Sequence, residues 1–240
     1  MRPASQRSKS AAIDPDTRYA IKAAARRLFA ERGIDGVSIR EIVVLAGQRN
    51  GGSVHYHFGS KEALVRELIV DGARLIDDLR NHQLDRITRD GALPSLREVI
   101  EVLVSPALHL AEDTYLRFIH TLQMNFRDMF LDALENQWNS GYRRCLAHIR
   151  ALLPEIPTAL LNQRLVFMDI YMTSAMATRE ASLNDSLRDH RFWKSPSVMA
   201  NFIDTMEQLL AGPVSAESLA TIKPRTKSSS SKTVRSGEEQ

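Results

Sequence analysis

The sequence predicts an all-α fold, and three observations support this. Apolar residues recur at the three- and four-residue spacing of helices along most of the chain, whereas the period-two alternation of strands is absent. An Asp-Pro pair at Asp14 and a Ser-x-x-Glu motif at Ser38 favour helix starts. With 240 residues, 43% of them apolar, the chain can bury a sizeable core in one or two domains.

The first helix is expected from Asp14 to about Arg32, because Asp14 can cap it and Pro15 suits its first turn. Residues 1–13 are basic and rich in serine, and we expect a flexible arm there. The inner face of the helix consists of apolar residues at helical spacing: Ile21, Ala24, Ala25, Leu28 and Phe29.

A second helix should begin at Ser38, where Ser38 and Glu41 have the spacing of a capping box. Gly47 stands where a helix can end in a left-handed residue. Asn50 can cap a third, short helix over 51–57, and Ser60 can cap a fourth. Two short helices joined by a tight turn are typical of a helix-turn-helix, which places its second helix in the major groove of DNA.

The rest of the chain should form a helical body. A long connecting helix is expected from Lys61 to about Asn81, and Pro154 and Pro157 should break the chain between later helices. Gly212 and Pro213 should end the folded region, because the polar tail after them can bury little apolar surface. The later helices are expected over 95–110, 113–132, 135–153, 158–183 and 196–210. We therefore divide the chain into an arm (1–13), a helix-turn-helix domain (14–61), a body (62–212) and a disordered tail (213–240).

The helix-turn-helix region resembles the TetR family of bacterial transcriptional regulators. His55 to Leu64 reads HYHFGSKEAL, which is similar to the family pattern aromatic-x-His-Phe-x-Ser-Lys-Glu-x-Leu. Leu28 to Gly33 (LFAERG) looks like the end of the family's first helix, and Val37 to Ile42 looks like the start of its second. The resemblance covers roughly residues 18–68. It departs from the common pattern at His55, where the family often has tyrosine, and by one extra residue in the turn.

The resemblance implies an N-terminal three-helix DNA-binding domain and a C-terminal domain for ligand binding and dimerisation. The chemistry of the side chains suggests phosphate contacts from the start of the second helix and from Lys61, and base contacts from the turn. Tyr56 can donate to phosphate or pack on a thymine methyl. Ser53 and His55 match positions that contact the DNA backbone in the family. The alternative for Asn50 and the two following glycines is a turn that only provides flexibility. The predicted DNA-binding residues are Ser38, Arg40, Gln48, Arg49, Asn50, Gly52, Ser53, His55, Tyr56 and Lys61.

The charge distribution agrees with binding to nucleic acid. Residues 1–61 hold 11 Lys and Arg against 5 Asp and Glu, a net charge of +6. Residues 62–212 carry −5 and residues 213–240 carry +2. A positive end on a negative body is expected when that end meets phosphate. No apolar run reaches the roughly 20 residues of a membrane span. The single cysteine, Cys145, suits a buried thiol in the reducing cytosol, so we expect a cytoplasmic protein.

The resemblance and the Met- and aromatic-rich middle helices together predict a pocket for a largely apolar small molecule. Plain core packing is the alternative for each of its residues. His109, Asp113 and His120 could share a side of the body, but a third strong metal ligand in register is missing, so we expect no metal. Nothing in the sequence indicates catalysis, so we expect neither a cofactor nor an enzyme. The predicted ligand-binding residues are Phe118, Leu122, Phe126, Phe130, Trp138, Tyr142 and Met172.

We expect a homodimer through the last two helices, Thr158–Leu183 and Pro196–Leu210, which would read a palindromic operator in double-stranded DNA. Their predicted interface residues are apolar: Leu160, Leu161, Leu165, Met168, Met172 and Met176, with Val198, Phe202, Ile203, Met206, Leu209 and Leu210. The leading hypothesis is a sequence-specific repressor that a ligand releases from its operator. The alternatives are a helical small-molecule-binding protein without specific DNA binding and a non-specific DNA binder.

Overall fold

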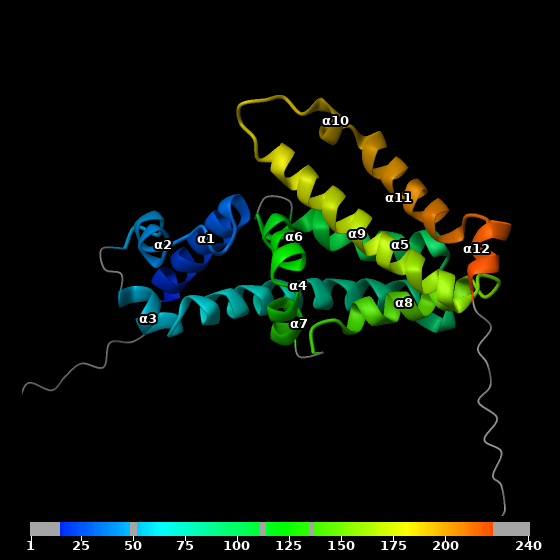
Figure 1. The fold of residues 1–240 in the computed structure, drawn as a ribbon, viewed down its shortest axis with the longest axis horizontal. Coiled ribbons are helices and arrows are strands. Elements are labelled where there is room, and N and C mark those ends of the chain that lie inside the picture. The colour runs from blue at the N-terminus through cyan, green and yellow to red at the C-terminus, as the bar shows by residue number, and fades with distance from the viewer. Residues whose placement is uncertain (1–14, 49–51, 111–113, 135–136, 223–240) are drawn as a thin grey trace, which may run out of the picture.

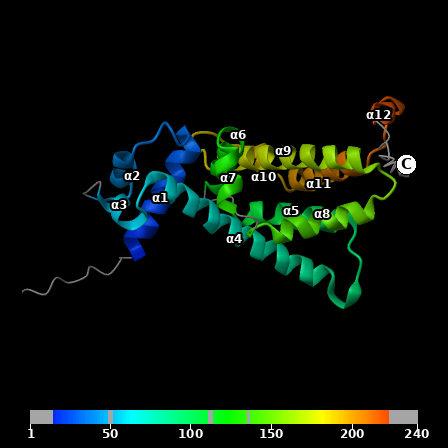
Figure 2. The same ribbon diagram turned by 60° about the horizontal axis from the view of Figure 1, so that its bottom comes forward.

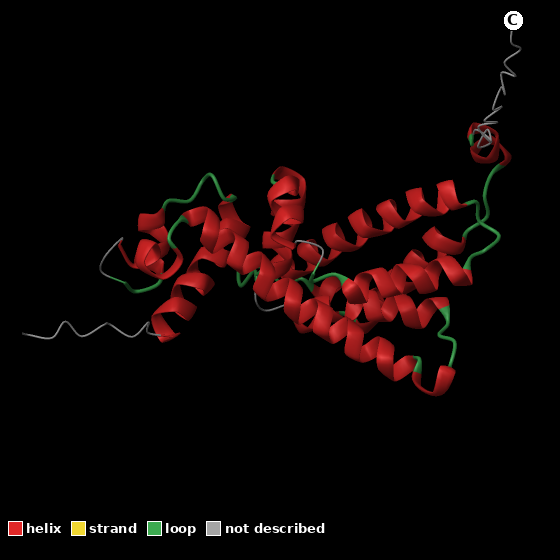
Figure 3. Ribbon diagram, turned by 90° about the horizontal axis from the view of Figure 1, so that it is seen from below, coloured by secondary structure: helices red, strands yellow, loops and turns green. Residues whose placement is uncertain are grey.

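A computed structural model describes residues 15–48, 52–110, 114–134 and 137–222. Within these ranges the chain folds into helices without any strand, which confirms the all-α prediction (Figure 3). The expected arm and most of the expected tail lie outside the described residues. In the described ranges, no helix combines the length and the apolar composition needed to cross a bilayer.

The first three helices form the small bundle that the sequence predicts. They are α1 (Pro15–Arg32), α2 (Ile39–Leu45) and α3 (Gly52–Phe58). Ser38 caps α2 and forms the full capping box with Glu41, as expected. After α2, Gly47 adopts the left-handed φ of +69°, so the chain turns sharply toward α3.

Helix α4 (Lys61–Ile87) connects the two parts of the molecule. The Ser60 side chain accepts the Ala63 N–H at its start, as predicted. The helix extends six residues beyond the expected end at Asn81 and runs along the long axis, from the N-terminal bundle through the body (Figure 1). The start of α4 therefore adjoins α3, while its end is part of the body.

The body is layered around α5 (Leu96–His109) and α8 (Ser140–Leu152). These two helices lie between α4 on one side and the pair α9 (Thr158–Leu183) and α11 (Pro196–Ala211) on the other (Figure 2). Ser95 caps α5 and forms a second capping box with Glu98. A single 3-10 turn, η1 (Arg89–Gly91), links α4 to the extended segment that precedes α5.

The structure corrects several predicted boundaries. The single helix expected over 113–132 is two helices, α6 (Tyr115–Asn125) and α7 (Arg127–Leu134), because the backbone at Phe126 leaves the helical region with φ −139° and ψ 41°. Helix α8 begins at Ser140 rather than near 135. Two short helices were not predicted: α10 (Arg191–Lys194) and α12 (Ala216–Thr221), of which α12 lies beyond the expected end of the folded region.

Two hydrophobic clusters divide the molecule at a different place from the predicted boundary at residue 62. The first joins α1–α3 and the first half of α4 to α6 and α7, with Phe29 and Phe118 fully buried and their ring centroids 6.1 Å apart. The second joins the end of α4 to α5, α8, α9 and α11. Helices α6 and α7 therefore pack with the N-terminal bundle, although α6 begins 57 residues after the end of α3.

Two long-range contacts hold α6 in this position. The Tyr115 hydroxyl donates to the Ile69 carbonyl of α4 at 3.2 Å, and its ring covers Gly72 so closely that a Cβ there would lie 1.9 Å from the ring. At the same end, the buried Glu180 carboxylate of α9 accepts the backbone N–H groups of Leu116 at 2.8 Å and Arg117 at 3.3 Å. Helix α6 thus joins α1, α4 and α9.

Candidate nucleic-acid interface

The turn between α2 and α3 contains three of the predicted base-contacting residues. Gln48 lies in it, half-buried, and its side-chain amide reaches the Ala46 carbonyl at 3.5 Å. Arg49 and Asn50 lie outside the described residues, so the structure does not place them. Their contact with bases stays a prediction.

Arg40 is the predicted phosphate contact that the structure leaves most accessible. It lies exposed in the first turn of α2 and makes no hydrogen bond or ion pair within the described residues. Ser38 is exposed beside it, although its hydroxyl already donates to Glu41 at 2.7 Å. The first N–H groups of a helix attract anions. The start of α2 can therefore meet a phosphate through Arg40 and the helix terminus together.

Helix α3 presents a polar outer side and an apolar inner side. Tyr56 is 58% exposed with its ring edge-on to His57, while Val54 is fully buried. Gly52 is exposed and Ser53 half-buried at the start of the helix. Tyr56 thus retains the accessible surface that the predicted contact with phosphate or a thymine methyl requires.

His55 has a local role in addition to its predicted backbone contact. Its Nδ1 lies 2.8 Å from the Gly59 carbonyl, just after the end of α3. Gly59 has a φ of +80°, which glycine adopts without strain. The imidazole therefore helps to close the α3–α4 turn, and its Nε2 edge is the part that can face DNA.

The structure corrects the role expected for Lys61. Its ammonium group turns inward and donates to the carbonyls of Ile34 and Val37, each at 2.6 Å. It also lies 5.8 Å from the centroid of the Phe29 ring. An ammonium has three donors, and two of them are held by the loop between α1 and α2. Lys61 fastens this loop to the start of α4 rather than projecting toward phosphate.

Other basic residues of this region are also paired within the protein. Arg18 and Lys22 of α1 form ion pairs with Glu67 of α4, and Lys22 pairs with Asp71 as well. The Arg18 guanidinium also lies 4.4 Å from the centroid of the Phe58 ring. The sequence count of +6 therefore overstates the charge available to DNA, because Arg18 and Lys22 attach α1 to α4.

The predicted ligand-binding residues do not line one site. Phe118 and Leu122 are fully buried in the first cluster, on which Phe126, Phe130 and Trp138 also pack. Tyr142 and Met172 belong to the second cluster. Helical spacing correctly identified these residues as facing inward. However, the inward-facing residues of α6–α9 are divided between two separate hydrophobic clusters. The predicted single pocket through all seven is therefore corrected.

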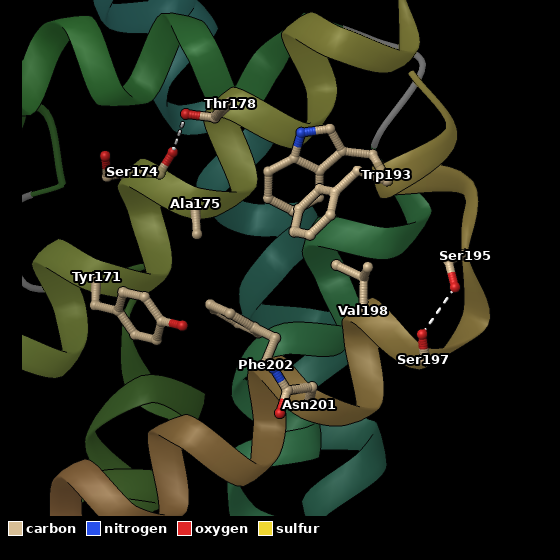
Figure 4. A pocket seen from close by; sticks show the side chains of 11 residues that line it. Tyr171, Ser174, Ala175, Thr178, Trp193, Ser195, Ser197, Val198, Asn201 and Phe202 are labelled. Carbon is tan, nitrogen blue, oxygen red and sulfur yellow. Dashed lines mark hydrogen bonds between the residues drawn. The ribbon is translucent and has the colours of Figure 1, made fainter. Parts of the chain in front are cut away.

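A different hollow, of about 880 Å³, opens between α9, α10 and α11 (Figure 4). Its wall is mainly aromatic and apolar, with hydroxyl groups and the Asn201 amide around it. This hollow was not predicted from the sequence, because Phe192 and Trp193 stand between two expected helices. Its lining residues are Tyr171, Ser174, Ala175, Thr178, Phe192, Trp193, Ser195, Ser197, Val198, Asn201 and Phe202.

Most of the residues predicted for the dimer interface are core residues of a single chain. Met168, Met172 and Met176 of α9 and Phe202 and Met206 of α11 are all buried in the second cluster. A different set of α9 side chains faces outward. Val166 and Phe167 are each 57% exposed, and Ile170 is 52% exposed.

Cys145 is fully buried in the second cluster, and burial raises the pKa of its thiol to about 11. This confirms the buried structural thiol expected from the sequence. In the described part of the chain, His, Cys, Asp and Glu side chains do not form a group of three or more that could hold a metal ion.

The comparison with known families concerns the same N-terminal segment. Residues 21–68, which include the inner face of α1, the helix-turn-helix and the start of α4, match the family model described as "Bacterial regulatory proteins, tetR family". The N-terminal segment of the chain is thus similar to the TetR family. The structural likeness extends further: a TetR family transcription regulator from Shewanella sp. PV-4 superposes with a TM-score of 0.55 over 81% of this chain and 96% of its own, at 20% identity.

Two curated proteins match parts of this sequence. The transcriptional repressor KstR2 of Rhodococcus jostii is 28% identical over 126 residues, which are 46% of this chain and 60% of that protein. The transcriptional repressor AcnR of Corynebacterium efficiens is 35% identical over 78 residues, 31% of this chain and 39% of its own. The chain thus aligns with less than two thirds of the length of either relative.

Proposed function

We propose that this chain is a TetR-family regulator: a sequence-specific DNA-binding transcriptional repressor that acts as a homodimer and is released from a palindromic operator by a small molecule. The observation that supports this most directly is the exposed surface of the helix-turn-helix, where the start of α2 and the outer side of α3 carry Arg40 and Tyr56. The names of both curated relatives as repressors support the direction of regulation.

In this proposal the contacts with DNA are divided by chemistry. Arg40, Ser38 and Ser53 hold phosphate, while Tyr56 and the turn residues Gln48, Arg49, Asn50 and Gly52 approach the bases. His55 contacts the backbone through the edge of its ring that faces away from Gly59. Lys61 supports the domain from inside.

The proposed dimer face lies on α9 and α11. Val166, Phe167, Ile170 and Tyr171 follow one another at helical spacing on α9 and keep much of their surface exposed. Tyr171 also lines the hollow between α9 and α11, so the exposed face and the hollow are continuous. A second copy packed on this face would cover both, and two such helices from each copy form a four-helix interface.

Selection of bound sites from random duplex DNA tests the DNA-binding part. We expect a palindrome whose half-sites lie about 34–36 Å apart, or a multiple of that distance. Arg40→Ala should weaken binding to every sequence and reduce the slope of log K against log salt by about one unit. The control is Arg27→Ala, because Arg27 is exposed on α1 but already pairs with Glu31 at 3.0 Å.

Equal affinity for operator and random DNA would favour a non-specific binder. Failure to bind any duplex would favour the alternative of a helical small-molecule-binding protein. Sedimentation tests the dimer: Phe167→Glu with Ile170→Glu should give folded monomers. Leu93→Glu with Leu187→Glu is the control, because these residues are 91% and 92% exposed but lie outside the proposed face. A dimer that persists in the first variant would place the interface elsewhere.

A further inference from the structure

The body contains an arginine whose hydrogen-bonding capacity is largely unused. Arg80, on α4, donates through Nη2 to the Leu103 carbonyl of α5 at 3.0 Å. Its Nε is buried and has no hydrogen-bond partner within the described residues. A guanidinium has five N–H donors, and a buried donor without a partner is costly. This group lies between α4, α5 and α8, because it contacts the Leu103 carbonyl of α5 and lies 5.6 Å from the centroid of the Tyr142 ring of α8.

Asp77 and Asp169 both act on Arg80 electrostatically, but no carboxylate of the described residues forms an ion pair with it. Asp77, one turn earlier on α4, is already occupied: it accepts the Ser140 hydroxyl and the Gly141 N–H, each at 2.7 Å, at the start of α8. Asp169 of α9 acts on Arg80 electrostatically but forms no ion pair with it. Instead, Asp169 accepts the Tyr142 hydroxyl at 3.5 Å. Within the described residues, carboxylates therefore lie near Arg80 but do not form an ion pair with it.

The electrostatic surroundings favour an added anion. Burial lowers the pKa of Arg80 and raises the pKa of Asp169, so both groups lack the stabilisation that a close ion pair would give. Two further cations face the same cluster, because Arg127 acts on Asp169 and Arg150 acts on Tyr142. Three arginines, Arg80, Arg127 and Arg150, against the two carboxylates of Asp77 and Asp169 give this part of the body an excess of positive charge.

The remaining surroundings are apolar and adaptable. The Tyr142 ring lies 5.6 Å from the Arg80 guanidinium, and Leu103 and Met168 are buried in the same cluster. Met172 follows Asp169 by one turn of α9 and is also buried in this cluster. Arg80, Tyr142 and Asp169 are each only partly buried, whereas the Arg80 Nε itself is buried.

We propose that Arg80 binds the carboxylate of an amphipathic organic acid, whose apolar part lies against Tyr142 and the methionines of α9. Arg80 would hold the acid through its unused N–H groups, in the forked geometry that guanidinium and carboxylate share. This inference rests on the proposed ligand-responsive function and names the chemical class of the ligand. Because Arg80 is on α4, occupation of the site would act on the helix that begins next to α3.

The test uses the full-length protein and dodecanoate, kept below its micelle-forming concentration, in isothermal titration and thermal unfolding. Dodecanoate should bind and raise Tm, whereas dodecanol and acetate, which lack the charge or the apolar tail, should do neither at the same concentration. Arg80→Gln should raise the Kd for dodecanoate at least about tenfold. The control is Arg144→Gln on α8, since Arg144 already has Asn81 and Asp85 as partners at 2.8 and 2.7 Å.

The stability of the unliganded variants separates a ligand site from a structural role. If Arg80 awaits a ligand, unliganded Arg80→Gln should unfold at the same temperature as the wild type or higher, because an unpaired buried charge has been removed. An Arg80→Gln protein that fails to fold, or that binds dodecanoate as the wild type does, overturns the inference. So does equal binding of dodecanol. Duplex binding is measured in parallel: DNA binding without dodecanoate binding overturns this inference alone, and loss of both overturns the proposed function too.

Discussion

At the start of both α2 and α6, a carboxylate accepts backbone N–H groups. The carboxylate at α2 belongs to the same helix, whereas the one at α6 belongs to a residue far away in the sequence. At α2 the acceptor is Glu41, which receives the Ser38 N–H at 2.8 Å from within the same helix. At α6 it is Glu180, which receives the Leu116 N–H from 64 residues away. Helix α2 can therefore be set by its own sequence, whereas the position of α6 depends on α9.

The same difference holds for the regions around these helices. The helix-turn-helix is built from local signals: a capping box, a left-handed glycine and a serine cap. Helix α6 is fixed by contacts with α1, α4 and α9, none of which follows it directly. Because α6 joins the core of the N-terminal bundle to α9, a change in the body can reach the DNA-binding helices through it.

Gly72→Leu should have the largest effect, because it breaks the long-range contact between α4 and α6. The new side chain would occupy the place of the Tyr115 ring, 1.9 Å from a Cβ at this position. The higher helix propensity of leucine, about 1 kcal/mol, is too small to offset such a clash. We expect a loss of at least about 3 kcal/mol in the free energy of unfolding, measured with urea.

Gly72→Leu combined with Tyr115→Ala provides the check on this cause. Removing the ring should recover part of the stability lost in Gly72→Leu, giving a favourable coupling energy between the two sites. Additive losses would show that the ring is not what Gly72 accommodates.

Glu180→Ala should have the next largest effect. It removes the acceptor of the Leu116 and Arg117 N–H groups and leaves the Arg117 guanidinium without its partner at 3.3 Å. Because Arg117 is partly exposed, water can take over some of these bonds, and we expect a loss of about 1–3 kcal/mol in the free energy of unfolding. Hydrogen exchange should speed up at the start of α6 but not at α2. Equal acceleration at both helices would contradict the separation of the two regions.

Lys61→Ala tests a difference between two basic residues of the N-terminal region. Lys61 supports the fold, whereas Arg40 is accessible to DNA. It removes two hydrogen bonds to the loop carbonyls of Ile34 and Val37, so stability should fall by roughly 1.5–3 kcal/mol. The salt slope of DNA binding should not change. Arg40→Ala should show the reverse pattern. A lower salt slope with unchanged stability in Lys61→Ala would restore its expected contact with phosphate.

Local signals explain why the sequence predicted some parts of the molecule well. The capping motifs and Gly47 place α2 and the start of α4 within a residue, and helical periodicity gives α9 its observed bounds. Periodicity shows that a side chain faces inward but not which neighbour it meets. Phe118 and Tyr142 both face inward, yet they lie in different clusters.

Side-chain chemistry was also ambiguous without the structure. Lys61 and Arg40 are both basic residues near a helix start, but only the fold shows that carbonyls of the α1–α2 loop take up the Lys61 ammonium. The break at Phe126 carries no proline or glycine signal. The unused donors of Arg80 depend on where Asp77 and Asp169 find other partners, which no local pattern encodes.

Arg32→Ala should have the smallest effect, and it tests a difference between the two capping boxes, one in each region. Hydrogen bonds from the Ser38 backbone and side chain, helped by Arg32 at 2.8 Å, lower the pKa of Glu41 from 4.5 to about 2. In the body, the Ser95 backbone and side chain lower the pKa of Glu98 without such an arginine. Because the folded-state pKa of Glu41 is below its ordinary value, its stabilising contribution is complete above pH 4.5 and is lost as the pH falls through about 2. An NMR titration of the side-chain carboxyls should show Glu41 titrating at a higher pH in Arg32→Ala, with Glu98 unchanged. An unchanged Glu41 titration would mean that this cap, like the one in the body, depends on its serine alone.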